Sequence, residues 1–166
     1  MFAKIKYFVL RKKQYFKNYM NPLKLREKIM TDTKLPDFCL DHTMLRVKDL
    51  ERSLDFYTRI LGMTVHRKTE YPEGRFTNTF VGYVGEDEGT NLELTYNWDQ
   101  PEEYTKGNAW GHLALKVTDV YAASAYLKRE GVEFTKEPSP MKNGTRILAF
   151  IKDPDGYVIE LNEPLS

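Results

Sequence analysis

Cysteine is nearly absent from the sequence: among 166 residues there is one, Cys39. A single cysteine excludes an internal disulfide framework and a thiolate cluster within one chain, and it agrees with a reducing cytoplasm. Long apolar runs are missing too, because no stretch approaches the roughly 20 residues that a membrane-spanning helix needs. We therefore expect a soluble, cytoplasmic protein, and its 41% hydrophobic and 30% charged residues are typical of a globular domain.

Excess positive charge is missing from most of the chain. Residues 1–34 contain ten Lys or Arg against two acids and carry +8; because the whole chain carries +1, residues 35–166 carry about −7. An acidic body argues against binding to nucleic acid, since counterion release from phosphates needs a basic surface. The extension is interpreted as a disordered tail, a targeting segment or codons preceding a start at Met20 or Met30. A secretory signal is disfavoured, and we expect residues 1–34 to be non-essential.

The rest of the chain contains an internal repeat. Residues 42–49 and residues 112–119 both read H-x-x-L-x-V-x-D without gaps. Helical patterns follow over residues 50–61 in the first copy and 120–130 in the second. The expected helix caps are Asp49 and Asp119 at the N-terminal ends and Gly62 and Gly131 at the C-terminal ends. A repeat of this length indicates that one structural unit occurs twice.

Each copy also ends in the same way, on a strand with one glutamate between aliphatic residues. These strands are Leu-Glu-Leu at 92–94 and Ile-Glu-Leu at 159–161. Hairpin-like segments precede them at 77–84 and 146–152, and the second is followed by the turn sequence Asp-Pro-Asp-Gly at 153–156. Each copy therefore reads β-α-β-β-β.

The predicted fold is α+β, with two βαβββ modules whose curved mixed sheets form a cleft. Module one covers about residues 38–98 and module two about residues 108–163. Duplicated folds often share only structure, so the functional question is which polar residues both copies keep.

Strand alternation places polar residues of both copies on the face away from the aliphatic residues. Successive side chains of a strand point to opposite faces. In module one, His42 and Arg46 then point into the concave side, and so does Glu93 on the last strand. His112 and Glu160 take the equivalent places in module two. Each module thus turns one histidine and one glutamate towards the same cleft.

A strand-borne His or Glu most often faces solvent without a function. This chain, however, has three histidines, and two of them occupy equivalent positions of the repeat, each with an equivalent glutamate. Two imidazoles and two carboxylates suit a divalent first-row metal, so we predict a metal site. The third histidine, His66, is interpreted as a surface residue. Without cysteine ligands, a structural zinc site is disfavoured.

Several longer stretches resemble glyoxalase I of the vicinal-oxygen-chelate superfamily, in its compact bacterial type. The resemblance covers about residues 38–163. Its most specific stretches are HTMLRV at 42–47, DFY at 55–57 with LGM at 61–63, LELTYNW at 92–98, GH at 111–112, and AF at 149–150 with DPDGYVIEL at 153–161.

The resemblance implies a lactoylglutathione lyase, a methylglyoxal-detoxifying carbon–sulfur lyase that converts the hemithioacetal of glutathione and methylglyoxal into S-D-lactoylglutathione through an enediolate. It places the metal ligands on His42, Glu93, His112 and Glu160, assembled across a homodimer. It makes Glu160 the catalytic base and Glu93 its catalytic counterpart across the metal. The short loop before His112 is similar to that of enzymes preferring nickel, with cobalt or zinc as alternatives.

The resemblance also implies substrate-binding residues, because Arg46 and Asn97 match positions that contact glutathione. The sequence departs from the longer enzymes at Asn108, where these have an arginine. A further basic contact falls on Lys136 or Lys142, and the sequence leaves this choice open.

Three other functions compete with this interpretation. An extradiol dioxygenase needs two histidines and one carboxylate with open iron positions, so the fourth ligand, Glu93, argues against it. A methylmalonyl-CoA epimerase would not explain the sequence Thr-Tyr-Asn-Trp at 95–98. A metal-free drug-sequestering protein of the same fold would not need two His–Glu pairs.

Overall fold

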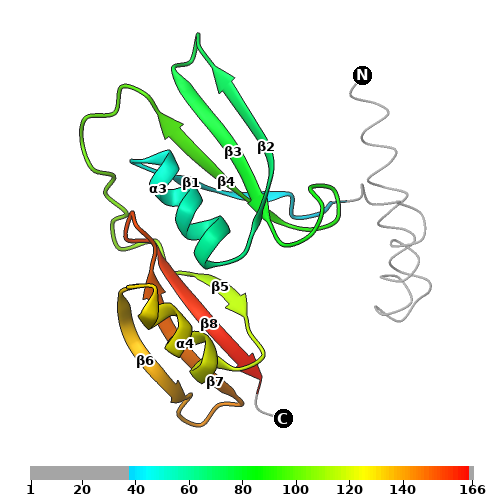
Figure 1. The fold of residues 1–166 in the computed structure, drawn as a ribbon, viewed down its shortest axis with the longest axis vertical. Helices are drawn as coiled ribbons and strands as arrows, with labels where there is room; N and C mark the ends of the chain where they lie inside the picture. Colours follow the sequence, from blue (N-terminus) through cyan, green and yellow to red (C-terminus); the bar gives the residue numbers. More distant parts are fainter. Residues whose placement is uncertain (1–37, 165–166) are drawn as a thin grey trace, which may run out of the picture. The chain divides into compact units, whose positions relative to one another are not determined.

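Two similar modules follow each other in the computed structural model, which describes residues 38–164 (Figure 1). The first contains β1 (His42–Arg46), α3 (Leu50–Leu54), η1 (Asp55–Ile60), β2 (Thr64–Tyr71), β3 (Phe76–Gly82) and β4 (Asn91–Asn97). The second contains β5 (Leu113–Lys116), α4 (Val120–Arg129), β6 (Phe134–Pro140), β7 (Arg146–Lys152) and β8 (Val158–Pro164). The predicted βαβββ order is therefore confirmed for both copies, whereas the predicted role of residues 1–34 lies outside the described residues.

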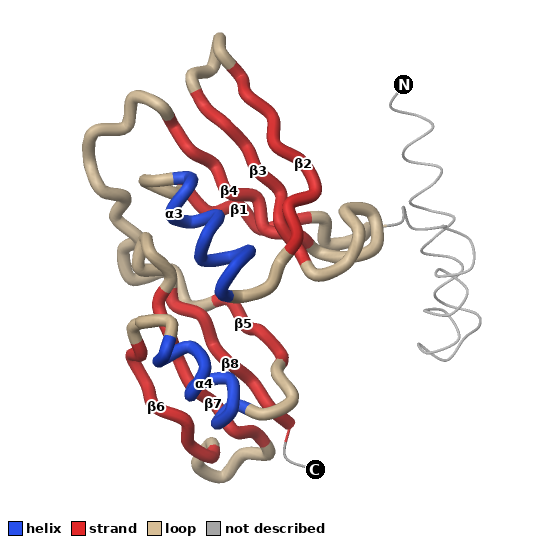
Figure 2. Tube along the Cα trace, viewed as in Figure 1, coloured by secondary structure: helices blue, strands red, loops and turns tan. Residues whose placement is uncertain are grey.

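The two sheets have the same topology. Their strand orders are β1-β4-β3-β2 and β5-β8-β7-β6. In each sheet the first strand runs parallel to the last, and the remaining pairs are antiparallel. A parallel pair needs a crossover connection, which the helix and the two intervening strands of each module supply. Figure 2 shows the helix and strands of each module, with a loop between β4 and β5 linking the modules.

The helix of the first module differs from its prediction. Asp49 caps it as predicted, because its side chain accepts a hydrogen bond from the backbone N–H of Arg52. The predicted single helix over 50–61 is, however, divided into α3 and the π-helical segment η1. There the N–H of Leu61 bonds to the carbonyl of Phe56, five residues back, which widens the turn. Gly62 then ends the helix with a φ of 76°, as a left-handed C-terminal residue does.

The helix of the second module follows its prediction closely. Asp119 accepts a hydrogen bond of 2.9 Å from the N–H of Ala122 and so caps α4. The helix ends at Arg129, one residue before the predicted end, and Gly131 has a φ of 77°. Neither α3 nor α4, the α-helices of residues 38–164, is long and apolar enough to cross a membrane.

Each sheet has an apolar face under its helix and a polar face away from it. Leu45 and Leu94 of the first sheet and Leu161 of the second are buried. One helix covers one face of each sheet, α3 in the first module and α4 in the second (Figure 1). Buried residues of both modules belong to one hydrophobic cluster, whose removal from water is the main stabilising contribution. The opposite faces carry the polar residues considered below.

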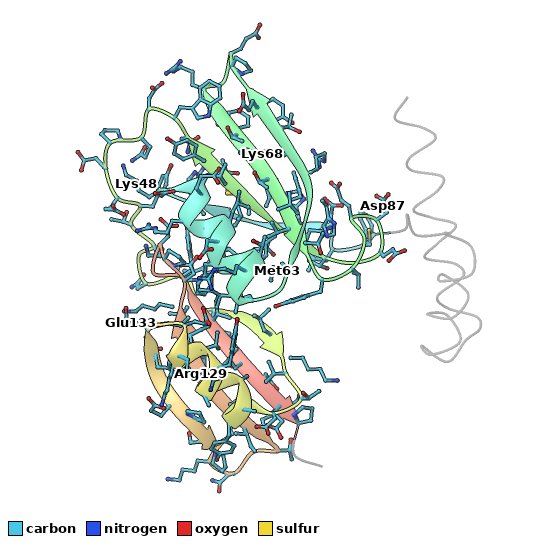
Figure 3. The ribbon with its side chains drawn as sticks, viewed as in Figure 1. Lys48, Met63, Lys68, Asp87, Arg129 and Glu133 are labelled. Atoms are coloured by element: carbon cyan, nitrogen blue, oxygen red, sulfur yellow. The ribbon has the colours of Figure 1, made fainter. Side chains whose placement is uncertain are left out.

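The predicted turn at 153–156 is present and also bonds to the first module. The Asp155 carboxylate accepts hydrogen bonds from the backbone N–H of Lys48 at 2.9 Å and from the hydroxyl of Ser53 at 3.0 Å; Lys48 lies between β1 and α3 (Figure 3). The buried hydroxyl of Tyr57 donates to Asp153 at 2.8 Å. Burial raises the pKa of Tyr57 well above its ordinary value, so the phenol stays protonated and donates.

Candidate metal centre

The first His–Glu pair lies on the polar face of the first sheet. His42 begins β1, and Glu93 lies on β4, which runs parallel beside it. In the strand register Met44 is the partner of Glu93. His42 is two residues before Met44 on the same strand, so it lies on the same face of the sheet as Glu93. His42 Nε2 is 3.0 Å from Glu93 Oε2, and the two side chains are 35% and 12% exposed. The glutamate is thus fixed in a largely buried place, and the imidazole is open to a ligand.

The second pair repeats this arrangement. His112 Nε2 is 3.3 Å from Glu160 Oε2, and the two side chains are 43% and 12% exposed. The prediction that His112 lies within a strand is wrong by one residue, because β5 begins at Leu113. Glu160 pairs with Ala114 across the parallel ladder, so the pair keeps the geometry of the first module.

The structure does not bring the four predicted ligands together in one chain. Within residues 38–164, no group of three or more His, Cys, Asp or Glu side chains is placed to hold a metal. Within each pair, the distance between the two donor atoms fits two adjacent ligands of one metal ion. Two donors bound side by side to an octahedral ion at about 2.1 Å would lie about 3.0 Å apart, close to the 3.0 Å and 3.3 Å observed. Each pair therefore has one nitrogen and one oxygen donor at the spacing of two adjacent ligands of one ion.

The second carboxylate oxygen of each glutamate is held by the residue two positions further along the strand. Glu93 Oε1 accepts from the hydroxyl of Thr95 at 2.8 Å. Glu160 Oε1 accepts from the amide of Asn162 at 2.6 Å. In each pair Oε2 faces the histidine, so the two oxygens have separate partners. Strand alternation places Thr95 and Asn162 on the faces of Glu93 and Glu160, because residues at i and i+2 of a strand share a face, but the sequence did not reveal their role in holding the carboxylates.

Each histidine also packs edge-on against a phenylalanine that sequence reasoning missed. The ring centroids are 5.4 Å apart for His42 and Phe80 and 5.5 Å apart for His112 and Phe150. Each phenylalanine pairs with the glutamate of its own half across the sheet. The repeat contained this signal, because both phenylalanines precede an aliphatic residue at equivalent strand positions.

Cations lie over both phenylalanine rings. The guanidinium of Arg67 is 4.0 Å from the centroid of Phe80, and it is also ion-paired with Glu86 at 2.7 Å. Lys136 Nζ is 5.7 Å from the centroid of Phe150. Of the two lysines that the sequence left open, Lys136 is therefore the one beside the second pair. Lys142 lies in the turn between β6 and β7.

The predicted substrate-binding residues share the polar face of the first sheet. Arg46 is exposed and pairs with Thr95 across the ladder, and Asn97 lies two residues beyond Thr95. The amide of Asn97 donates to the hydroxyl of Tyr104 at 2.8 Å. Tyr104, in the loop that follows β4, was missed because no repeat or motif singles it out.

Two histidines have surroundings that the sequence did not predict. The side chain of His66 is not wholly on the surface, because its Nε2 is buried and has no hydrogen-bond partner within residues 38–164. His42 Nδ1 lies 2.5 Å from the Asp41 carboxylate. A carboxylate on the second nitrogen is typical of metal-binding histidines, since it fixes the ring orientation. The residue of the second half that is equivalent to Asp41 is Gly111, which has no carboxylate to offer His112.

Comparison with known proteins agrees with this fold. A family model described as the Glyoxalase/Bleomycin resistance protein/Dioxygenase superfamily matches residues 39–161. Lactoylglutathione lyase of Neisseria meningitidis serogroup B is 56% identical over 125 residues, which are 75% of this chain and 90% of that protein. Lactoylglutathione lyase of Escherichia coli O157:H7 is 49% identical over 122 residues, covering 74% and 90%.

A solved structure leads to the same family. The chain superposes on the trypanothione-dependent glyoxalase I of Leishmania major with a TM-score of 0.68 and 42% identity, covering 76% of this chain and 87% of that one. The matched region contains both modules and both His–Glu pairs. The chain therefore belongs to the glyoxalase I family, the lactoylglutathione lyases, within this superfamily.

Proposed function

We propose that this chain carries out the lactoylglutathione lyase reaction of its family at a metal centre shared between two subunits. The chain is a carbon–sulfur lyase of the glyoxalase I type. In the proposed site, His42 and Glu93 come from one subunit and His112 and Glu160 from the other. The substrate is the hemithioacetal of glutathione and methylglyoxal, and the product is S-D-lactoylglutathione. The reaction detoxifies methylglyoxal in the cytoplasm.

The observation that carries this proposal is the placement of the two pairs. Each pair has its donor atoms 3.0 Å or 3.3 Å apart, as two ligands of one ion would. Within residues 38–164 they do not form one group of four. A homodimer with two-fold symmetry would bring the first pair of each subunit to the second pair of the other. Two complete sites would result for each dimer.

The four donors suit a divalent ion of the first transition row. Two imidazole nitrogens and two carboxylate oxygens leave two octahedral positions open, a geometry that nickel accepts readily. We propose nickel as the native metal, with cobalt and zinc as alternatives. When bound, such an ion would supply Lewis acidity for the negative charge that develops on the substrate oxygens.

Glu160 is the proposed base. Its carboxylate would take the proton from the carbon beside the carbonyl, which leaves an enediolate, and would return the proton to the neighbouring carbon. One group can serve both carbons because they are adjacent, and no net proton is gained or lost. The side chain of Glu160 is 12% exposed, so few waters compete for the proton. Glu93 is its counterpart on the other side of the metal.

Arg46 and Asn97 are the proposed anchors of glutathione. Glutathione carries two carboxylates and amide groups, which an exposed guanidinium and a side-chain amide can bind. Both residues lie on the face of the first sheet that also carries His42 and Glu93. Tyr104 bonds to Asn97 and so restricts the direction of the amide.

Metal reconstitution tests the proposed function. The apoprotein is loaded separately with nickel, cobalt, zinc and manganese, and thioester formation from glutathione and methylglyoxal is followed by absorbance. We expect activity to return with nickel and to depend on one ion for each site. Thioester formation by the metal-free protein at the same rate would contradict the proposal.

A further inference from the structure

Glu160 is held at both oxygens by its own module. Oε2 lies 3.3 Å from His112 Nε2, and Oε1 accepts a hydrogen bond of 2.6 Å from Asn162 Nδ2. A carboxylate with both oxygens occupied cannot rotate about its last bond without breaking a contact. Asn162 therefore decides which oxygen of Glu160 faces the metal position.

A third residue fixes the direction of the Asn162 amide. Arg146 Nη1 donates to Asn162 Oδ1 at 3.0 Å. An asparagine amide can turn by 180°, which would exchange its donor and its acceptor. A guanidinium has only donors, so Arg146 requires the oxygen on its own side. The NH₂ group must then point to Glu160, and its hydrogen bond to a carboxylate is charge-assisted.

The backbone explains why these three side chains meet. Glu160 and Asn162 are two residues apart on β8 and so share a face. On the neighbouring strand β7, Leu148 is the register partner of Asn162, and Arg146 lies two residues before Leu148, at the first position of the strand. The long arginine side chain spans that diagonal, which is within its reach in an antiparallel pair.

The first module has a looser version of the same arrangement. Thr95 Oγ1 lies 2.8 Å from Glu93 Oε1 and 3.2 Å from Asn78 Oδ1. A hydroxyl has one proton and rotates freely, so it can donate to only one of these oxygens at a time. Asn78 is also neutral. Glu93 thus depends on a rotating donor, whereas Glu160 depends on an amide held by a cation.

We infer that Arg146 and Asn162 are positioning residues for Glu160. They hold Oε1 so that Oε2 is presented to the metal and the substrate, and they make Glu160 the more rigid of the two carboxylates. The inference rests on the proposed function, because that function makes Glu160 a metal ligand and the base. Loss of partners that hold a ligating carboxylate typically costs 10–100-fold in metal affinity or activity.

The test uses Asn162→Leu, which keeps the side-chain shape and removes the amide. We expect kcat to fall about tenfold with little change in KM, and the nickel dissociation constant, measured by competition with a chelator, to rise about tenfold. Asn162→Thr copies the first module and should restore at least half of both losses. Arg129→Met is the matched control for loss of a cation in this module, because Arg129 is exposed on α4 and belongs to neither His–Glu pair (Figure 3).

The variant Arg146→Met tests whether Arg146 acts on Glu160 through Asn162 or independently of it. If Arg146 acts only by orienting Asn162, the double variant with Asn162→Leu should equal Asn162→Leu alone. The inference is overturned if Asn162→Leu keeps kcat and nickel affinity within twofold of the wild type. Independent, multiplying effects of the two substitutions would also overturn it. The nickel titration needs no turnover, so an inactive wild type would contradict the proposed function and leave this measurement decisive.

Discussion

The two modules differ in the charges around their His–Glu pairs. In the first, Arg67 over Phe80 is neutralised by Glu86, and His42 has Asp41 on its second nitrogen. In the second, Lys136 takes the place of Arg67 over Phe150. The backbones share strand order and pairing. The two modules thus share a backbone arrangement and differ in the individual side chains around each pair.

Removal of a histidine from the second half should have the largest effect. We expect His112→Ala to lose nickel and lyase activity together, because the substitution deletes a ligand. His66→Ala is the control, since His66 belongs to neither pair. Metal content after gel filtration, measured beside activity, checks this prediction. A variant that keeps its nickel would remove His112 from the ligand set.

Glu160→Gln should separate metal binding from chemistry. The amide oxygen can still coordinate, but it cannot accept a proton, and a positioned general base contributes about 10²–10⁴-fold in rate. We expect a loss of kcat in this range with nickel retained. Glu93→Gln is the comparison in the other half and should lose less kcat. Equal losses would contradict the division of roles between the two carboxylates.

Mixed dimers test whether the site is shared. We expect a Glu160→Gln chain and a His42→Ala chain each to be inactive alone, whereas in a heterodimer both lesions fall in one proposed site and the other site stays intact. Re-equilibrated heterodimers should recover up to half of the activity per dimer. If heterodimers form and no activity returns, each site is built within one chain.

Substrate binding should depend on the first half at Arg46. We expect Arg46→Ala to raise KM about tenfold or more and to change kcat little, because an anchored substrate carboxylate contributes equally in the ground and transition states. Lys116 is the equivalent residue of the second half, and Lys116→Ala is the matched comparison. The KM values of both variants decide whether the two halves divide binding from proton transfer.

The contacts of the turn at 153–156 should affect stability and not chemistry. Tyr57→Phe removes a buried hydrogen bond to Asp153, and a hydrogen bond to a charged group contributes about 1.5–3 kcal/mol. We expect the free energy of unfolding in urea to fall by this amount while nickel affinity stays unchanged. Leu127 is the repeat equivalent of Tyr57 and has no hydroxyl to lose. A loss of nickel affinity would show that the turn also positions the pairs.

Truncation of residues 1–34 should have the smallest effect, because both copies of the repeat lie outside this segment. Turnover and dimerisation of the shortened chain are expected to equal those of the full chain. A tenfold fall in kcat/KM would assign the extension to the site or to the fold.

Much of the fold could be predicted because the signals are local or periodic. Asp49 and Asp119 as caps, Gly62 and Gly131 as helix ends, and the shared H-x-x-L-x-V-x-D pattern were all readable in single stretches of sequence. The faces of His42, Glu93 and Glu160 followed from strand alternation, whereas His112 lies one residue before β5. Their role as metal ligands stays a prediction.

The tertiary structure decided what depends on residues far apart in the chain. The bonds from Asp155 to Lys48 and Ser53, and the contact of Arg146 with Asn162, leave no periodic trace in the sequence. Each needs a register or a packing distance that only the folded chain defines. By itself the sequence determined the duplicated order of helix and strands and the polar face of each sheet, because the backbone geometry of helices and strands is periodic. Contacts between neighbouring strands decided which oxygen of a glutamate is held, and by which residue.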